Sequence, residues 1–220
     1  MKRLFPRLVL ASVSPRRLEL LDLLGVPFDV VPSGVDESLL VAPDSVAFAR
    51  LAAREKCQEV AARVEPDTVV LAADTVVHYH DATGRDITLG KPANPEDAVR
   101  MLRTLSGREH EVTTGVAVRL AGGSIVVESA TTGVRFRVLN DREIEEYVAT
   151  GEPLDKAGAY GIQGGAGRFV EEVRGDLQNV IGLPVRLVAG LLSVDFPGLV
   201  SPGGPASQQV GSVLPSFQNR

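Results

Sequence analysis

Cysteine is almost absent from this sequence, and positive and negative charges nearly balance. The one cysteine, Cys57, cannot form an intrachain disulfide, so nothing indicates an oxidising compartment. A formal net charge of -5 over 220 residues favours neither nucleic acid nor a membrane surface as a partner. We therefore expect no nucleic-acid or membrane partner, and any anionic ligand must be held by a local basic cluster.

Long apolar runs are also missing. The basic start of the sequence, residues 1–6, leads into an apolar stretch that Ser12 and Ser14 interrupt too soon for a signal peptide or a membrane span. Together with the single cysteine, this pattern predicts a cytoplasmic protein.

Familiar nucleotide, zinc and thiol motifs are absent as well. The sequence has no Gly-x-x-x-x-Gly-Lys-Ser/Thr loop and no Gly-x-Gly-x-x-Gly after a strand. His78, His80 and His110 lack the partners of zinc ligands, so we expect them to be structural or exposed. Cys57 has no recognisable base beside it, and a thiol nucleophile is not expected.

Strand-like and helix-like segments alternate along the chain and predict one α/β domain with a mixed twisted sheet flanked by helices. From Pro197 the composition changes to Pro, Gly, Ser and Gln, which predicts a domain at 1–196 and a disordered tail at 197–220. Residues 78–86 read as a polar hairpin tip. The expected strands are 7–11, 28–31, 69–77, 111–120, 125–137 and 169–173, and the longer helices are 44–64, 94–107 and 184–192.

Two arginines stand where helix electrostatics disfavour them. A short strand runs into a helix that Ser14 caps, and Arg16 and Arg17 occupy its first turn. The helix dipole already places partial positive charge there. A bound anion would resolve the conflict, because free backbone N–H groups, the Ser12 and Ser14 hydroxyls and both guanidinium groups would contact it. The alternative is a solvated basic turn with salt bridges to nearby acids.

A carboxylate interrupts an apolar strand at Asp74. Burying an ionised carboxylate costs several kcal/mol, on the order of the usual desolvation penalty, unless a cation pairs with it. A metal ion or a basic side chain in a cleft would supply that pairing. We favour a functional acid, because ligand clefts form at strand ends in α/β sheets. In the alternative, Asp74 faces water at a strand edge.

Weaker signals come from three further charged residues and from a glycine-dense segment. Lys56 on the long helix and Lys91 between Gly90 and Pro92 could neutralise phosphate oxygens, although each alone is typical of a surface lysine. Glu37 lies in an acidic loop. In residues 154–164 the glycines allow a ligand to approach the backbone closely, and the Gln163 amide could read a base edge. A flexible surface loop is the alternative for this segment.

Taken together, these segments resemble the Maf family of nucleoside triphosphate pyrophosphatases. The resemblance runs in order over about residues 7–195. Two departures are a hairpin at 78–88 that looks longer than usual and a tail after Pro197 without a counterpart. The motifs that carry the resemblance are Ala-Ser-Val-Ser-Pro-Arg-Arg (11–17), Arg-Glu-Lys (54–56), Ala-Asp-Thr-Val-Val (73–77), Gly-Lys-Pro (90–92), Leu-Ser-Gly (105–107), Asp-Lys-Ala-Gly-Ala-Tyr-Gly-Ile-Gln-Gly (155–164) and Asn-Val-Ile-Gly-Leu-Pro (179–184).

The resemblance implies an ITPase-like fold with a central nucleotide-binding cleft, and a hydrolase that converts a nucleoside triphosphate to the monophosphate and diphosphate. It also implies a divalent metal cofactor, Mg²⁺ or Mn²⁺, and a chain that is often dimeric, so a homodimer is among the expected states. By the same resemblance, Asp74 is the proton acceptor for the attacking water, and Glu37 joins it at the metal. The substrate-binding residues would be Ser12, Arg17, Lys56 and Lys91 at the phosphates, with Arg16, Thr75 and Gln163 at positions linked to substrate choice.

The resemblance also separates the branches of the family. Arg16 and Thr75 favour the dTTP/UTP type, because the 7-methyl-GTP branch usually has an aromatic residue and Gln at these positions. Two alternatives stay open. The chain could be a house-cleaning pyrophosphatase for 7-methyl-GTP or for ITP and XTP, or a non-catalytic nucleotide-binding division regulator, which metal-dependent release of diphosphate would exclude.

Overall fold

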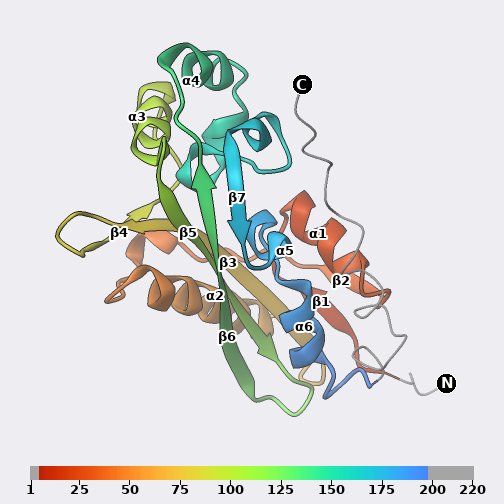
Figure 1. Ribbon diagram of the computed structural model, residues 1–220. Helices are drawn as coiled ribbons and strands as arrows, with labels where there is room; N and C mark the ends of the chain where they lie inside the picture. The colour runs from red at the N-terminus through yellow and green to blue at the C-terminus, as the bar shows by residue number, and fades with distance from the viewer. Residues whose placement is uncertain (1–4, 198–220) are drawn as a thin grey trace.

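A seven-stranded mixed sheet runs through the centre of the computed structural model, which describes residues 5–197 (Figure 1). The strand order is β2-β1-β3-β5-β6-β7, and β4 pairs with the C-terminal end of β3. β1 pairs in parallel with β2 and β3, whereas the other pairs are antiparallel. The strands are β1 (Leu8–Leu10), β2 (Phe28–Val30), β3 (Val69–His80), β4 (Asp86–Leu89), β5 (Glu109–Arg119), β6 (Ile125–Phe136) and β7 (Val170–Arg174).

Helices cover both faces of this sheet (Figure 1). On one face α2 packs over β3 and β5. On the other face α1, α5 and α6 bury their apolar sides, and α3 and α4 pack together near the end of β6. The predicted α/β fold class is therefore confirmed. The helices are α1 (Pro15–Asp22), α2 (Ser45–Ala61), α3 (Pro95–Leu105), α4 (Asp141–Val148), α5 (Leu177–Ile181) and α6 (Val185–Leu192).

The alternation of side chains along β3 assigns neighbouring residues to opposite faces. Val70 and Ala72 belong to the core cluster under α2, whereas Leu71 and Ala73 belong to the larger cluster on the other face. Asp74 and Thr75 continue this alternation. Asp74 therefore points toward α2, and Thr75 points toward α1 and α5.

A single glycine sets how closely α2 approaches the sheet. Gly115 of β5 lies opposite Asp74 in the antiparallel register. A Cβ at this position would overlap the backbone carbonyl of Ala49 in α2. The absence of a side chain thus lets the helix backbone rest directly on the strand, next to the strand position that carries Asp74.

The sequence-based assignment of the segments was correct for most elements and wrong for one. Residues 78–80 were predicted in a hairpin tip, but β3 extends to His80 and β4 begins at Asp86. The reason is that His78 is buried, with Nδ1 3.1 Å from Asp86 Oδ1 and Nε2 2.9 Å from Thr113 Oγ1. The short helix α5 was not predicted.

The limits of the domain remain a prediction. The buried core runs from Leu8 to Phe196, within the predicted 1–196 domain. The predicted disordered tail at 197–220 lies, apart from its first residue, outside the described residues. Between residues 5 and 197, none of the helices has the length and apolar character needed to cross a membrane.

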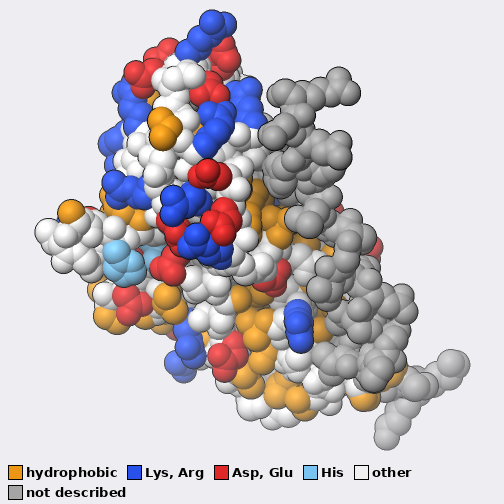
Figure 2. All heavy atoms as spheres, in the orientation of Figure 1, with side chains coloured by type: hydrophobic (Ala, Val, Ile, Leu, Met, Phe, Trp, Pro, Cys, Tyr) orange, Lys and Arg blue, Asp and Glu red, His pale blue; other side chains and the backbone are white. Residues whose placement is uncertain are grey.

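One face of the molecule carries both acidic and basic side chains, several of which form ion pairs with one another. Figure 2 shows acidic and basic side chains interspersed where β5, β6 and β7 lie side by side. Glu109 of β5, for example, pairs with Arg135 of β6 at 3.4 Å and with Arg174 of β7 at 3.0 Å.

Candidate active site

A cavity of about 1090 Å³ opens where the short parallel strand β1 ends and β3 continues. This is the carboxyl end of the parallel part of the sheet, the usual place for a ligand crevice in α/β folds. All nine residues selected from the sequence line the cavity, namely Ser12, Arg16, Arg17, Glu37, Lys56, Asp74, Thr75, Lys91 and Gln163. The fold therefore brings every candidate to one place, while their individual roles stay predictions.

Two carboxylates converge on one ammonium group at the floor of this cavity. Lys56 Nζ of α2 lies 2.7 Å from Asp74 Oδ1 and 2.5 Å from Glu37 Oε1. Asp74 is only 6% exposed, so its charge requires a partner, which Lys56 supplies. The trio carries one net negative charge and already gathers two carboxylate oxygens around a cation.

Arg17 is held on the opposite side of β3. Its Nε donates to the Gly182 carbonyl at 2.9 Å and its Nη2 donates to Thr75 Oγ1 at 3.1 Å. Thr75 Oγ1 also lies 2.9 Å from Thr114 Oγ1, which donates to the Asn179 carbonyl at 3.0 Å. Burial lowers the pKa of the Arg17 guanidinium, and the charges of Asp74 and Glu37 oppose that shift. Through its hydrogen bond, Thr75 thus helps to fix the orientation of the Arg17 guanidinium group.

The start of α1 keeps its N-terminal end available to a ligand. Ser14 is the N-cap residue, as predicted, but its side chain makes no capping hydrogen bond, and no acidic residue occupies the first turn. Ser12 Oγ instead accepts from the Ser14 N–H at 3.2 Å. Arg16 lines the cavity, and its charge adds to the stronger effect of Lys156 in lowering the pKa of Asp155.

The glycine-dense segment is packed into the protein rather than loose on its surface. Ala159, Tyr160 and Ile162 are buried, while Gln163 is exposed at the cavity. The Gly158 N–H donates to the Gly90 carbonyl at 3.0 Å, which ties this wall to the segment bearing Lys91. The alternative of a flexible surface loop does not match these contacts.

Sequence reasoning missed several residues of this wall. Glu152, Lys156 and Tyr160 line the cavity but were assigned no role. Lys156 Nζ donates to the Glu152 carbonyl at 2.8 Å, and Tyr160 OH lies 2.9 Å from His110 Nε2. The only signal was their place within or beside the glycine-dense segment, which does not distinguish a cavity wall from a loop.

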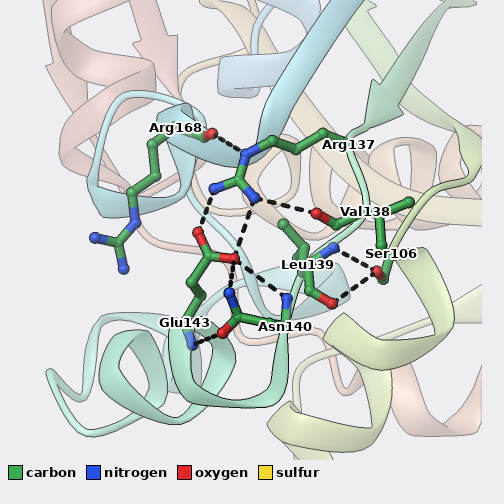
Figure 3. Close-up of polar contacts among 7 residues, drawn as sticks. All are labelled: Ser106, Arg137, Val138, Leu139, Asn140, Glu143 and Arg168. Carbon is green, nitrogen blue, oxygen red and sulfur yellow. Dashed lines mark hydrogen bonds and ion pairs between the residues drawn. The ribbon is translucent and has the colours of Figure 1, made fainter. Parts of the chain in front are cut away.

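Helix α4 contacts the same wall through Tyr147, and its first turn is held by several hydrogen bonds (Figure 3). Arg137 donates through Nη2 to Glu143 Oε1 at 2.5 Å and through Nη1 to Glu143 Oε2 at 3.2 Å. Glu143 and Asn140 complete a reciprocal capping box. The Arg137 hydrogen bonds, followed by the Asn140 backbone N–H, lower the pKa of Glu143 to about 2.

Two of the three histidines, His78 and His110, are buried, and so is Cys57. Burial is the main cause that lowers the pKa of His110 to about 3, and burial raises the pKa of the Cys57 thiol to about 11. His80 is exposed at the end of β3. Among residues 5–197, no group of three or more His, Cys, Asp and Glu side chains is arranged to hold a metal ion.

Comparison with known proteins identifies similar chains. A family model described as "Maf-like protein" matches residues 7–194. A dTTP/UTP pyrophosphatase of Anaeromyxobacter dehalogenans (strain 2CP-C) is 53% identical over 190 residues, covering 85% of this chain and 93% of that protein. A dTTP/UTP pyrophosphatase of Chromobacterium violaceum is 46% identical over 191 residues, with coverage of 85% and 93%. A crystal structure of a nucleoside-triphosphatase / dITP/XTP pyrophosphatase from Mycobacterium abscessus aligns with a TM-score of 0.36 and 17% identity, over 59% of this chain and 74% of that one.

Proposed function

This chain belongs to the Maf-like family, and we propose that it is a nucleoside triphosphate pyrophosphatase that hydrolyses dTTP and UTP to the monophosphate and diphosphate. The observation that carries the proposal is the convergence of Glu37, Lys56 and Asp74 in one cavity with Arg17. Relatives at 53% and 46% identity bear the name dTTP/UTP pyrophosphatase and support the choice of substrate.

Asp74 is the proposed general base. Hydrolysis of the anhydride between the α and β phosphates requires that a water molecule lose a proton as it attacks. Asp74 lines the cavity and is 6% exposed, with Oδ1 2.7 Å from Lys56 Nζ. It would accept that proton, and the diphosphate would leave with the electron pair of the broken P–O bond.

Basic groups around the cavity would bind the triphosphate and stabilise the charge that develops on the leaving diphosphate. Arg17 is pre-oriented by Gly182 and Thr75, so little side-chain freedom is lost when a phosphate binds. Lys56 and Lys91 line the same cavity and would act as point charges on phosphate oxygens. Ser12 and the first turn of α1 would add hydrogen bonds from the other side.

Glu37 and Asp74 fit a divalent cation such as Mg²⁺ or Mn²⁺. Their oxygens already converge on one positive charge, and Mg²⁺ is commonly bound by one or two carboxylates together with substrate phosphates. When bound, such an ion neutralises phosphate oxygens and makes water easier to deprotonate.

Gln163 would recognise the base. It is exposed at the cavity, and its amide can donate and accept at once, as the paired edge of thymine or uracil requires. Arg16 and Thr75 complete the set proposed for substrate choice. For the protein as a whole we propose a cytoplasmic location, supported by the single buried cysteine, and a homodimer on the family resemblance alone.

The test is diphosphate release from dTTP, UTP, CTP, 7-methyl-GTP, ITP and the other common triphosphates, with Mg²⁺ or Mn²⁺ and with EDTA. We expect EDTA-sensitive cleavage with dTTP and UTP preferred. Preference for 7-methyl-GTP or ITP would keep the reaction and overturn the substrate assignment. Binding of triphosphates without cleavage would instead indicate a nucleotide-binding regulator.

A further inference from the structure

The residue proposed to read the base, Gln163, lies near the tip of a tight turn. The Gly164 N–H donates to the Gly161 carbonyl at 3.0 Å, so Ile162 and Gln163 are its two central residues. Ile162 is buried and Gln163 is exposed at the cavity. The position of the Gln163 amide therefore depends on what holds the two ends of this turn.

Two side chains outside the turn hold Gly161 at its first end and Gly165, the residue after its last. Tyr147 OH, at the end of α4, accepts from the Gly161 N–H at 3.1 Å. Glu152 Oε2 accepts from the Gly165 N–H at 3.0 Å. The two side chains are joined, because Tyr147 OH donates to Glu152 Oε1 at 2.9 Å. We call Tyr147 and Glu152 the clamp.

The clamp fits closely beneath the turn. A Cβ on Gly164 would overlap the Glu152 carboxylate, and a Cβ on Gly161 would press against the Lys156 side chain. Lys156 in turn donates to the Glu152 carbonyl at 2.8 Å. Tyr147 is 1% exposed, with its ring edge-on to Phe169 at a centroid distance of 5.3 Å. The clamp is thus fixed by the core and leaves the turn little space to move.

The chemistry of Glu152 suits this position. An ionised carboxylate accepts hydrogen bonds on both oxygens, so it can serve the Tyr147 hydroxyl and the Gly165 N–H together. A glutamine has one acceptor oxygen, and its NH₂ group would face one of these two donors. If the NH₂ group faces the Gly165 N–H, that N–H loses its acceptor; if it faces Tyr147, the hydroxyl must accept from it and its own proton loses its partner.

We propose that Tyr147 and Glu152 are positioning residues for base selection, which hold the 161–165 turn so that the Gln163 amide meets the base edge. This inference rests on the proposed function, since it assumes that the cavity binds a nucleotide. Neither residue contacts the Glu37, Lys56 and Asp74 trio through any hydrogen bond among the described residues. Their effect is therefore expected in substrate discrimination rather than in the chemical step.

The experiment compares Tyr147→Phe and Glu152→Gln with the full-length wild-type protein. For each, kcat and KM are measured with dTTP and with CTP, whose base edge has the opposite donor and acceptor pattern. We expect the ratio of kcat/KM for dTTP over CTP to fall by about tenfold, since a site built to hydrogen-bond its substrate depends on correct placement of those groups. The loss should appear in the KM for dTTP, with kcat kept within about threefold.

Two matched controls separate positioning from general destabilisation. Tyr79→Phe removes a hydroxyl from β3, and Glu146→Gln neutralises an acid on α4 that pairs with Arg142. Neither residue lines the cavity, so the dTTP/CTP ratio should not change. Amide hydrogen exchange at Gly161 and Gly165 should accelerate in the clamp variants and not in the controls.

A double-mutant cycle with Gln163→Ala gives the decisive result. If the clamp acts through Gln163, then Tyr147→Phe adds no further loss of discrimination once Gln163 is removed. An unchanged dTTP/CTP ratio in both clamp variants, or an additive loss in the double variant, would overturn the inference. Were the wild-type protein to cleave no nucleotide, the proposed function would fail, and equilibrium binding of dTTP and CTP to the same variants would still decide the role of the clamp.

Discussion

Burial of Asp74 costs free energy of folding, and the same residue is the proposed general base. Its carboxylate lies within β3, where Asp74 is 6% exposed and follows a run of five buried apolar residues, Val69–Ala73. Lys56 offsets the cost of this burial, and Glu37 shares the same ammonium group. The structure tolerates a charged acid here because the sheet presents it to a cavity with a cation beside it.

The first prediction concerns this acid. Asp74→Asn keeps the size of the side chain but removes its proton affinity, so turnover of dTTP should fall by at least about a hundredfold, within the usual range for loss of a general base. Steady-state release of diphosphate measures the effect, with circular dichroism to confirm folding. A folded variant with near-native turnover would falsify the catalytic assignment of Asp74.

At the scale of elements, the close contact between α2 and β5 determines where Lys56 lies. The helix backbone at Ala49 rests on Gly115, and Lys56 follows two turns later on the same helix. Any side chain at 115 must push α2 away from the sheet or bend the strand. The position of Lys56 is therefore coupled to a glycine that does not line the cavity.

The second prediction tests this coupling. Gly115→Ala should destabilise the protein by about 1–3 kcal/mol, as overpacking of a tight contact does, and should also lower kcat/KM. Urea unfolding followed by circular dichroism measures the stability. Gly190→Ala is the matched control, because Gly190 is exposed within α6 with open space around it, and alanine there should stabilise by about 0.5–1 kcal/mol. Equal effects of the two substitutions would contradict the close-contact argument.

The first turn of α4 supplies a third prediction, on pH. The pKa of Glu143 is lowered from its ordinary value of 4.5 to about 2, first by Arg137 and then by the Asn140 N–H. A carboxyl group whose pKa is lower in the folded than in the unfolded state stabilises the fold. This stabilisation is complete above the unfolded-state pKa and is lost as the pH falls through the folded-state pKa. The stability that Glu143 contributes should therefore be lost between pH 4.5 and about 2.

Comparison of the wild-type protein with Glu143→Gln isolates this contribution from the other carboxylates. The difference in Tm should be largest above pH 4.5 and should vanish near pH 2. Thermal melts across this window measure it. A difference that stays constant with pH would mean that the Arg137–Glu143 pair does not stabilise through its charge (Figure 3).

At the scale of the whole molecule, the cavity joins segments from distant parts of the chain. The end of β1, the middle of β3 and the segments at 152–164 and 180–182 all contribute to its walls. A ligand that contacts these walls together binds the folded protein and not the unfolded chain, so it must stabilise the fold as a unit.

The fourth prediction follows from this linkage. In Asp74→Asn, which should bind without turnover, dTTP with Mg²⁺ at 100 times its Kd should add about 2.7 kcal/mol of stability. For a chain of this size that corresponds to a rise in Tm of about 5–10 °C. Differential scanning fluorimetry measures the shift, and CTP at the same concentration should give a smaller one. Equal shifts for both nucleotides would argue against base selection in this cavity.

The sequence by itself determined the local features of this protein. Periodicity and capping residues predicted most strands and helices, including the helix that Ser14 begins, because these signals act over a few neighbouring residues. Motifs resembling a known family also identified the nine candidate residues, and the structure places all of them in one cavity. Their catalytic and binding roles remain predictions.

Only the tertiary structure decided which of these residues meet. The contacts of Lys56 with Glu37 and Asp74, and of Arg17 with Thr75, join positions far apart in the chain, so they depend on sheet register and helix packing. The extension of β3 to His80 depends likewise on its pairing with β4. The support of the Gln163 turn by Tyr147 and Glu152 had no sequence signal, because a hydrogen bond from a side chain to a backbone N–H leaves no periodic pattern.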